Sequence, residues 1–475
     1  MSLPRIINSL IKPVLQYYSM DWLKNKNYAE KMGAKIRAHI ARTSKTNIGQ
    51  KLGISSNTGI REIPFTHYGF YEPFFENPQE GDFIYHLEDY VRAFTSGTMG
   101  RPKTFLLPKK GLWNSISKTG MTFMFLCTHN GDKITYEVGD TVYENMPGGQ
   151  FISSFYHDII DKRIQGGWVN QVPDVNLPFQ NKIDYYVENY KDIDVAYMTV
   201  TSLLDQVYPK IKEPLNLKGF ITQDRSAFTL KDKIKKITGS YPKTVYGSTE
   251  TMFGALPSIE HPGCFFFDWR ILYPEFIPEE DALEHKDVTS KPIESTLDMS
   301  EVEVGRVYQF IATPYGNDLI RYVMPDLLEC IALGDEKLGT NIPVFRYYSR
   351  SDNLLVLHNF TRINEDELLV IIGSTGIEYV DFVVNRELVD SREYLKLYIE
   401  LKSPYDEDEL YKILNERLTD FDKDWNDLRE MLEYDPLIIQ LLPKGTFQRY
   451  LQRKSGVPKY TRVNMSDENL KLLLN

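Results

Sequence analysis

The sequence has few cysteines, no long apolar run and no excess of positive charge. Its three cysteines, Cys127, Cys264 and Cys330, are odd in number and lack metal-ligand spacing. This usage indicates small core thiols in a reducing compartment rather than a disulfide framework or a zinc site. The formal net charge of −11 argues against a general nucleic-acid binder, because counterion release needs a basic face. The net charge does not exclude a local basic site.

Signals for export and membrane insertion are also missing. No apolar run approaches the ~20 residues that span a bilayer. The amphipathic N-terminus is interrupted by Pro4 and Pro13 and has no apolar stretch of signal-peptide type. We find no repeat of fixed period and no low-complexity tract. We therefore expect a cytoplasmic protein with no membrane partner and no nucleic-acid partner.

The length and composition are typical of a large globular protein. The 475 residues are 42% apolar and 25% charged, enough for two or three domains with full cores. Strand-like and helix-like segments alternate through the middle of the chain, which predicts α/β layering with a largely parallel sheet. The segment 229–239 is one such helix, with Thr229 as a candidate N-cap and Gly239 as its stop.

The pattern of predicted strands and helices changes near Ser349. The residues that follow predict a hairpin, two strands, a long acidic helix and a further strand, and a basic tail ends the chain. We therefore predict a large multi-sheet α/β domain over residues 1–348 and a small α+β domain over residues 349–475.

The first candidate site is "FTSGTMGRPKTF", which follows a predicted strand. It is not a Walker A loop, because two residues separate its glycines and Arg-Pro-Lys follows. It nonetheless combines glycines that can turn backbone amides toward an anion with hydroxyl donors and positive charge. Those residues are Thr95, Ser96, Gly97, Thr98, Gly100, Arg101 and Lys103. Phosphate binding and an ordinary surface turn are the two interpretations.

The second candidate is "VYGSTE", where another predicted strand ends. Tyr246 can stack on a base or an acyl group, and Glu250 can hold Mg²⁺, which prefers oxygen ligands. Between them lie Gly247, Ser248 and Thr249. Alone, this segment is equally a plain loop at a strand end.

Two further segments carry charges in a suggestive order. Asp326 follows Arg321 by five residues, and its carboxylate suits the two hydroxyls of a ribose, whereas a structural Arg–Asp salt bridge is equally consistent. Arg350 and Asp352 lie at the predicted domain boundary, with Arg362 beyond them. By themselves they read as a charged turn before a hairpin.

Together, in this order, the four segments resemble the adenylate-forming enzyme superfamily, which includes acyl-CoA synthetases and nonribosomal-peptide adenylation domains. Within it the sequence looks most like the GH3 acyl-acid amido synthetases and the phenylacetate–CoA ligases. The likeness rests on "IPFTHYGFYEPFFENP", "NLLVLHNFTRINEDEL" and "LLPKGTFQRYLQRKSG" followed by "PKYTRV". It implies a large adenylation domain and a small, mobile C-terminal lid domain.

The resemblance also implies roles for individual residues. The loop from Thr95 to Lys103 would hold the phosphates of ATP, and Tyr246 and the residues after it would lie near adenine and the α-phosphate. Glu250 would bind Mg²⁺ and Asp326 the ribose. The other residues with implied roles are Arg350 and Arg362 at the nucleotide, Asp352 at the hinge, and Lys459 or, in reserve, Lys454 as the catalytic lysine.

Three positions depart from the pattern of the superfamily. Ser349, Asn353 and Pro325 stand where a glycine, an aspartate and a glycine are usual. The implied reaction is activation of a carboxylic acid by MgATP, followed by transfer to an amino acid. The alternatives are transfer to CoA and a nucleotide-binding protein without catalysis.

Overall fold

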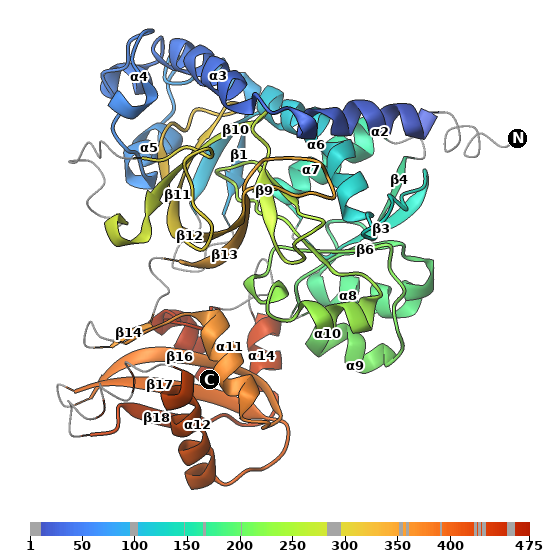
Figure 1. Cartoon of the computed structure of the whole chain (residues 1–475), viewed down its shortest axis with the longest axis vertical. Coiled ribbons are helices and arrows are strands. Elements are labelled where there is room, and N and C mark those ends of the chain that lie inside the picture. Colours follow the sequence, from blue (N-terminus) through green and yellow to red (C-terminus); the bar gives the residue numbers. More distant parts are fainter. Residues whose placement is uncertain are drawn as a thin grey trace, which may run out of the picture. The chain divides into compact units, whose positions relative to one another are not determined.

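The structure is a computed structural model in which two compact units are defined. It describes residues 11–95, 103–146, 148–164, 168–200, 202–282, 296–350, 355–357, 361–389, 392–421, 425, 429, 434–453 and 461–475. Among these residues, the first unit ends at Tyr347 and the second begins at Tyr348. The predicted boundary between residues 348 and 349 stays a prediction. The fold class is the predicted mixed α/β fold (Figure 1).

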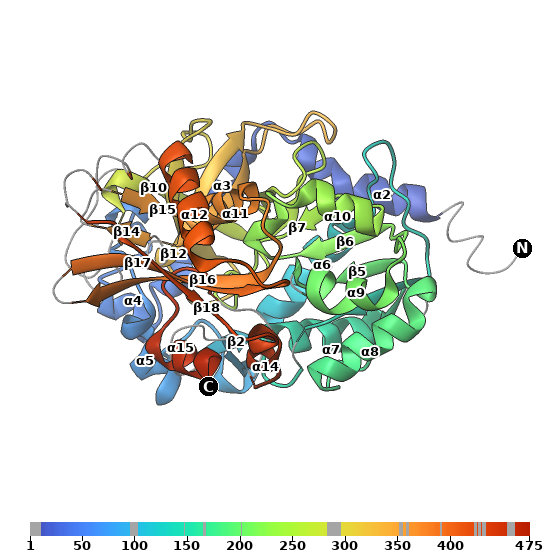
Figure 2. The same ribbon diagram turned by 90° about the horizontal axis from the view of Figure 1, so that it is seen from below.

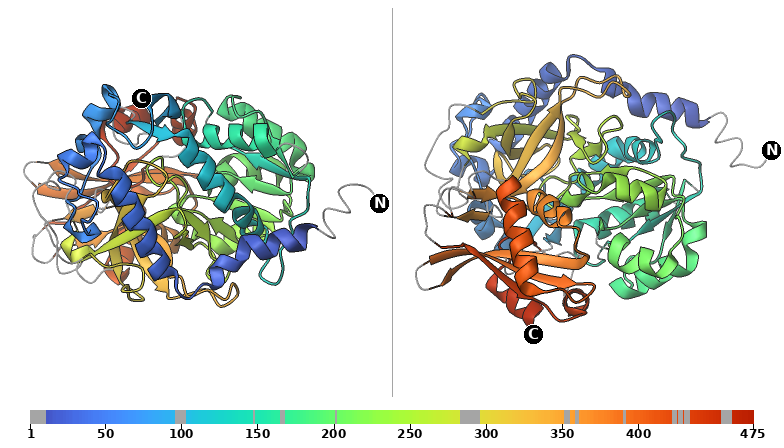
Figure 3. Two further views of the ribbon diagram at one scale, coloured as in Figure 1. Left: turned by 90° about the horizontal axis from the view of Figure 1, so that it is seen from above. Right: turned by 60° about the horizontal axis from the view of Figure 1, so that its bottom comes forward.

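The first elements of the first unit are helices, and they cover one side of it (Figure 3, left). Leu23, Met32, Ile36 and Ile40 share one buried core with Phe266 and Trp269 of the later strand region. The leading helices therefore pack on a sheet that is far away in sequence. They are α2 (Lys12–Met20), η2 (Asp21–Lys24), α3 (Tyr28–Thr43), α4 (Asn47–Lys51), η3 (Ile60–Glu62), α5 (Tyr68–Glu76) and η4 (Leu87–Asp89).

A five-stranded sheet of order β4-β3-β5-β6-β7 confirms the predicted α/β alternation, because every neighbouring pair is parallel. One face packs on α8 and α10 through Ile183, Phe220 and Ile234, and the other meets α6 at Cys127 and Val195. The strands are β3 (Asp140–Glu144), β4 (Val169–Val172), β5 (Val195–Tyr197), β6 (Gly219–Thr222) and β7 (Pro242–Thr244). The helical segments are α6 (Lys109–Cys127), α7 (Ile152–Ile164), α8 (Phe179–Asn189), η5 (Tyr190–Asp192), the π-helix η6 (Ser202–Val207), α9 (Tyr208–Ile211), η7 (Arg225–Ala227) and α10 (Lys231–Thr238).

The helix predicted over 229–239 shows one correct boundary and one wrong one. Gly239 ends α10 in the left-handed conformation, with φ of 82°, which glycine adopts without strain. The N-cap is Leu230 rather than Thr229, and no side chain caps that end.

A six-stranded sheet of order β10-β11-β12-β13-β9-β8 forms the second layer of this unit. Strands β10, β11 and β12 pair antiparallel, as do β13, β9 and β8. Its interior is aromatic, with Phe267 stacked on Phe310 and Phe276 on Phe345. The strands are β8 (Ala255–Pro257), β9 (Phe265–Phe267), β10 (Leu272–Pro278), β11 (Val307–Pro314), β12 (Tyr322–Ala332) and β13 (Val344–Arg350), with η8 (Glu279–Asp281) after β10.

The second unit is a three-stranded sheet between two pairs of helices (Figure 2). Strand β17 pairs antiparallel with β16 and parallel with β18. Helices α11 and α12 pack on one side of the sheet, and α14 and α15 pack on the other. The elements are the hairpin β14 (Leu355–Leu357) and β15 (Thr361–Ile363), α11 (Glu365–Ser374), β16 (Tyr379–Val389), β17 (Arg392–Leu401), α12 (Glu407–Phe421), β18 (Leu437–Leu441), α14 (Thr446–Arg453) and α15 (Asp467–Leu474).

Two buried carboxylate clusters fix the C-terminal tail to this sheet. Glu400 accepts hydrogen bonds from the backbone N–H groups of Gly445, at 2.5 Å, and Phe447, at 3.0 Å. The guanidinium of Arg462 pairs with Asp381 and Glu365, both at 2.7 Å. The described residues before 454 and after 460 are thus held to the sheet, and residues 454–460 themselves lie outside the described ranges.

None of the helices that the structure describes combines the length and the apolarity needed to cross a membrane.

Candidate functional site

The two ends of the predicted phosphate loop meet at the base of a hairpin. Strands β1 (Tyr90–Phe94) and β2 (Thr104–Pro108) pair antiparallel, and Phe94 lies opposite Thr104. Beyond them the Thr95 N–H donates to the Lys103 carbonyl at 3.0 Å, and the Lys103 N–H donates to Thr95 Oγ1 at 3.2 Å. A strand followed by a loop was predicted here, and residues 96–102 themselves lie outside the described residues.

The Lys103 ammonium has a ring contact and acts electrostatically on the second motif. It lies over the ring of Tyr68, 5.1 Å from the centroid, and the Tyr68 hydroxyl accepts from the Thr104 N–H at 3.0 Å. The same ammonium lowers the pKa of the Glu250 carboxyl against the effect of burial. The loop end and the Glu250 motif are therefore brought together electrostatically.

The loop after β7 is tightly built around Glu250. The Ser248 N–H donates to Thr251 Oγ1 at 3.1 Å, and the Met252 N–H donates to the Ser248 carbonyl at 3.0 Å. Gly247 is needed at its position, because a Cβ there would lie 2.4 Å from the Phe253 ring. The Asn317 side-chain amide donates to the Glu250 carbonyl at 2.8 Å. These contacts fix the backbone that carries the Glu250 side chain.

Glu250 is a buried carboxyl, only 9% exposed. Burial raises its pKa, and the neighbouring charge of Asp326 raises it further, while hydrogen bonds and Lys103 act in the opposite direction. A carboxyl in such surroundings is stabilised in its charged form by an added cation.

Asp326 accepts hydrogen bonds from two tyrosines. Tyr246 donates to Oδ2 and Tyr347 donates to Oδ1 at 3.1 Å. Burial raises the pKa of Tyr246 far above its usual value, and Asp326 adds to the effect, so the tyrosine stays a donor. Its ring stacks on Phe265, 5.4 Å between centroids. Each carboxylate oxygen has two lone pairs, so Asp326 keeps acceptor capacity for a further hydroxyl.

Arg321 is not the partner of Asp326. Its guanidinium, 1% exposed, pairs with Glu275 at 3.0 Å and donates to the Ile63 carbonyl at 2.7 Å. It also lies over the Phe65 ring, 4.1 Å from the centroid. The interpretation of an Arg321–Asp326 salt bridge is therefore wrong, and Asp326 is left to the tyrosines.

The remaining predicted residues lie on strands, in the Glu250 loop or outside the described ranges. Arg350 ends β13 and Arg362 lies in β15, and both side chains lie outside the described set. Thr249 is buried. The residues wholly outside the described ranges are Ser96, Gly97, Thr98, Gly100, Arg101, Asp352, Lys454 and Lys459. Their roles stay predictions.

Three contributors were missed from the sequence. Tyr347 lies three residues before Arg350 on the same strand, and a period-two reading of that strand could have marked it as facing one side with Phe345. Tyr68 and Asn317 reach the site from distant segments. No local pattern signals either of them.

The site has few protein ligands for a metal. Within the described ranges, no group of three or more His, Cys, Asp or Glu side chains is arranged to hold an ion. Glu250, with Asp326 near enough to raise its pKa, fits Mg²⁺, which keeps several waters and binds through one or two carboxylates plus substrate phosphates.

Comparison with solved structures identifies the fold as that of adenylate-forming enzymes. An acyl acid amido synthetase, AtGH3.15 in complex with 2,4-DB, matches with a TM-score of 0.71 and 14% identity, covering 100% of this chain and 96% of that one. A 2-hydroxyisobutyryl-CoA ligase in its postadenylation state with R3-HIB-AMP matches with a TM-score of 0.65 and 13% identity, covering 93% and 91%. The predicted fold is confirmed.

A narrower match concerns the six-stranded sheet. Residues 265–350, from β9 to β13, match the GH3 family central domain. This segment contains Asp326, Tyr347 and Arg350, so the resemblance to GH3 proteins predicted from the motifs is confirmed there. An ATP-bound RpMatB-BxBclM chimera also matches, with a TM-score of 0.51 and 14% identity over 76% of this chain and 66% of that one. A search of the sequence against curated proteins finds no match.

Proposed function

We propose that the protein activates a carboxylic acid with MgATP as an acyl-adenylate and transfers the acyl group to an amino acid. The observation that carries this proposal is that Lys103, Glu250 and Asp326 lie in one unit of an adenylate-forming fold, with Asp326 hydrogen-bonded to Tyr246 at the start of the Glu250 motif. These groups supply a cation for phosphates, a carboxylate for a metal and a carboxylate for ribose hydroxyls.

In the first half-reaction, a carboxylate oxygen of the acid attacks the α-phosphorus of ATP. The bond from that phosphorus to the bridging oxygen breaks, and pyrophosphate leaves with the electron pair. The loop from Thr95 to Lys103 orients and neutralises the phosphates. Mg²⁺, when bound at Glu250, supplies further charge stabilisation. Tyr246 and Tyr347 hold the Asp326 carboxylate toward the ribose, and Arg350 and Arg362 are assigned to the nucleotide.

In the second half-reaction, the acceptor nitrogen attacks the carbonyl carbon of the adenylate. The carbonyl carbon–oxygen bond to AMP breaks, the nitrogen loses a proton and an amide forms.

A lysine from the C-terminal tail completes the site of the first half-reaction, adenylation. Lys459 is the first choice and Lys454 is the reserve. The contacts of Glu400 and Arg462 fix the described residues on either side of these two lysines to the sheet of the second unit.

Pyrophosphate exchange into ATP tests the proposal. We would screen aliphatic, aryl and indolic acids, and then offer amino acids or CoA to the acid that supports exchange. Lys459→Ala should lower exchange by about 10²–10³-fold, by analogy with the loss of one charged stabiliser, while ATP still binds. Lys471→Ala, on helix α15, is the matched control and should be unaffected.

The outcomes separate three functions. Amide formation supports the proposal, and thioester formation with CoA assigns the protein to the acyl-CoA ligases, whose solved relatives share the fold. ATP binding without pyrophosphate release for any acid indicates a non-catalytic nucleotide binder. Unimpaired exchange in Lys459→Ala and in Lys454→Ala would remove both lysines from the mechanism.

A further inference from the structure

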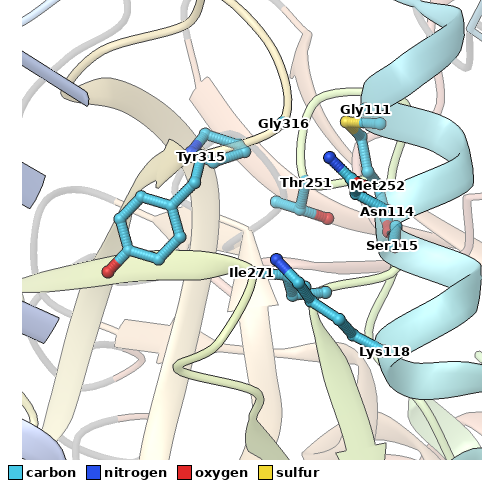
Figure 4. A pocket seen from close by; sticks show the side chains of 10 residues that line it. Gly111, Asn114, Ser115, Lys118, Thr251, Met252, Ile271, Tyr315 and Gly316 are labelled. Carbon is cyan, nitrogen blue, oxygen red and sulfur yellow. Dashed lines mark hydrogen bonds between the residues drawn. The ribbon is translucent and has the colours of Figure 1, made fainter. Parts of the chain in front are cut away.

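A pocket lies behind the Glu250 loop, on the side of the first unit where α6 begins. Its cavity volume is about 30 Å³, which is room for a small group of atoms, since a single water needs roughly 10–15 Å³ by this measure. Figure 4 shows Asn114 and Lys118 reaching from α6 toward Thr251. The other lining residues are Gly111, Ser115, Met252, Ile271, Pro314, Tyr315 and Gly316.

Close backbone packing shapes this pocket. A Cβ on Gly111, in the first turn of α6, would lie 1.9 Å from the Gly316 carbonyl oxygen, so only glycine allows the loop to approach the helix. Ser115 Oγ donates to the Met252 carbonyl at 3.0 Å. The pocket thus has a fixed wall and a fixed floor, and the floor is the loop that carries Glu250.

Four cations gather around this pocket. Lys118 lines it, and the Lys35 ammonium lies over the ring of Tyr315 at 5.7 Å. Arg42 donates to the Tyr315 carbonyl at 3.2 Å. Partial burial lowers the pKa of Lys118, the Asp268 carboxylate raises it, and the nearby Arg270 and Arg42 lower it further. The pKa of Lys35 is likewise lowered by burial and next by Lys118.

The two carboxylates that face this cluster already have partners. Asp268 holds Arg270 through bonds of 2.9 Å to Oδ1 and 2.5 Å to Oδ2. Asp318 accepts from the Ile84 N–H and from the Tyr90 hydroxyl, both at 2.7 Å. Among the described residues neither Lys35 nor Lys118 has a salt-bridge partner, although the Asp268 carboxylate raises the pKa of both lysines. The chain as a whole has a net charge of −11, so a local excess of positive charge indicates a place where an anion is attracted.

We propose that this pocket binds a phosphoryl group, either free phosphate or the phosphate of a small organic molecule. Lys118 and Lys35 provide mobile charged donors, and the Asn114 carboxamide provides neutral N–H donors. At Lys35 the repulsion from Lys118 exceeds the attraction of Asp268, and a bound anion relieves that repulsion. The site differs from the predicted phosphate loop and does not depend on the proposed reaction.

Lysine footprinting on the full chain locates the binding. The protein is acetylated with and without inorganic phosphate at constant ionic strength set by chloride, and each lysine is read by mass spectrometry. We expect phosphate to reduce the labelling of Lys118 and Lys35 at least five-fold, with Lys233 on the exposed side of α10 unchanged. A parallel arm with glycerol 3-phosphate separates free phosphate from a phosphate ester, and the tighter-binding arm names the source.

Titration calorimetry with variants gives the second readout. Lys118→Gln should weaken phosphate binding at least ten-fold, Lys118→Arg should remain within about three-fold of the native protein, and Lys233→Gln should not change it. ATP affinity should be the same in all of them, since the predicted nucleotide residues are untouched. Phosphate affinity unchanged in Lys118→Gln, protection by chloride alone, or binding of succinate but not of phosphate would overturn the proposal.

Discussion

Arg321 and Asp326 lie near each other in the chain but belong to two different kinds of region. Arg321 is buried within a network in which Glu275, Thr296 and backbone carbonyls use its donors. Asp326 lies at the candidate site, where two tyrosine hydroxyls hold it and acceptor capacity is left. The Arg321 charge stabilises the first unit, and the Asp326 charge is oriented for a ligand.

This difference separates stability from binding. A buried ion pair whose partner is removed leaves an uncompensated charge in a medium of low dielectric. A carboxylate that keeps acceptor capacity beyond its tyrosine partners loses mainly what it would have bound. Variants of the two residues should therefore fail in different assays, and the following predictions run from the largest expected effect to the smallest.

Arg321→Met should lower the free energy of unfolding by about 3–5 kcal/mol, the usual cost of breaking a buried pair by removing one partner. Glu275, 1% exposed, would be left without its counter-ion. Urea unfolding of the full chain measures the effect. The matched control is Arg61→Met, which breaks an exposed 2.6 Å pair with Glu301 and should cost less than about 1 kcal/mol. Equal losses in the two variants would erase the distinction drawn for Arg321.

Asp326→Asn should leave the free energy of unfolding within about 1 kcal/mol of the native value. It should weaken ATP binding at least ten-fold, about 1.4 kcal/mol at 25 °C, because a charged acceptor for ribose hydroxyls is lost. Calorimetric titration with ATP measures the affinity. Asp184→Asn, an exposed carboxylate paired with Lys210, should change neither quantity. A stability loss comparable to that of Arg321→Met would place Asp326 in the structural class.

The sequence motifs predicted where the strands at the candidate site end, because local chemistry determines those boundaries. Strand β1 ends at Phe94, directly before Thr95 of the first motif, and β7 ends at Thr244, directly before the second. Gly239 ended its helix because only glycine adopts φ of 82° there without strain. Such features depend on a few neighbouring residues.

The partners of the charges could not be predicted in the same way. Glu275 reaches Arg321 across 46 residues of sequence, and Tyr68 reaches the strand after the loop across 36. Both contacts result from the packing of separate layers, which periodicity does not specify. The Thr229 cap failed for a related reason, since a threonine before a helix is only one of several ways to begin it.

Tyr347→Phe should have a smaller effect than Asp326→Asn. It removes one of the two hydroxyls that orient Asp326, and a single hydrogen bond contributes about 0.5–1.5 kcal/mol. We expect ATP affinity to fall roughly three- to ten-fold with stability nearly unchanged. Tyr190→Phe, which removes an exposed hydroxyl bonded to Glu213 at 2.9 Å, is the control. An effect equal to that of Asp326→Asn would mean that Tyr347 contacts the ligand itself.

The smallest effect concerns the pH dependence of stability at Glu250. Burial raises the pKa of this carboxyl in the folded protein, so the folded state binds its proton more tightly than the unfolded state does. Stability must then fall as the pH rises from the ordinary carboxyl pKa through the raised one. Glu250→Gln removes this titration, so the variant should be more stable than the native protein at neutral pH.

The advantage of Glu250→Gln should vanish at acid pH, where the native carboxyl is protonated in both states. Urea midpoints across pH 4 to 8 without nucleotide or metal measure it, and Glu188→Gln on the exposed side of α8 is the control. A loss of stability at neutral pH in Glu250→Gln would show that Lys103 and the hydrogen bonds at Glu250 outweigh its burial. Glu250 would then resemble Glu275, a carboxylate held by the fold, and would no longer be a buried charge awaiting a cation.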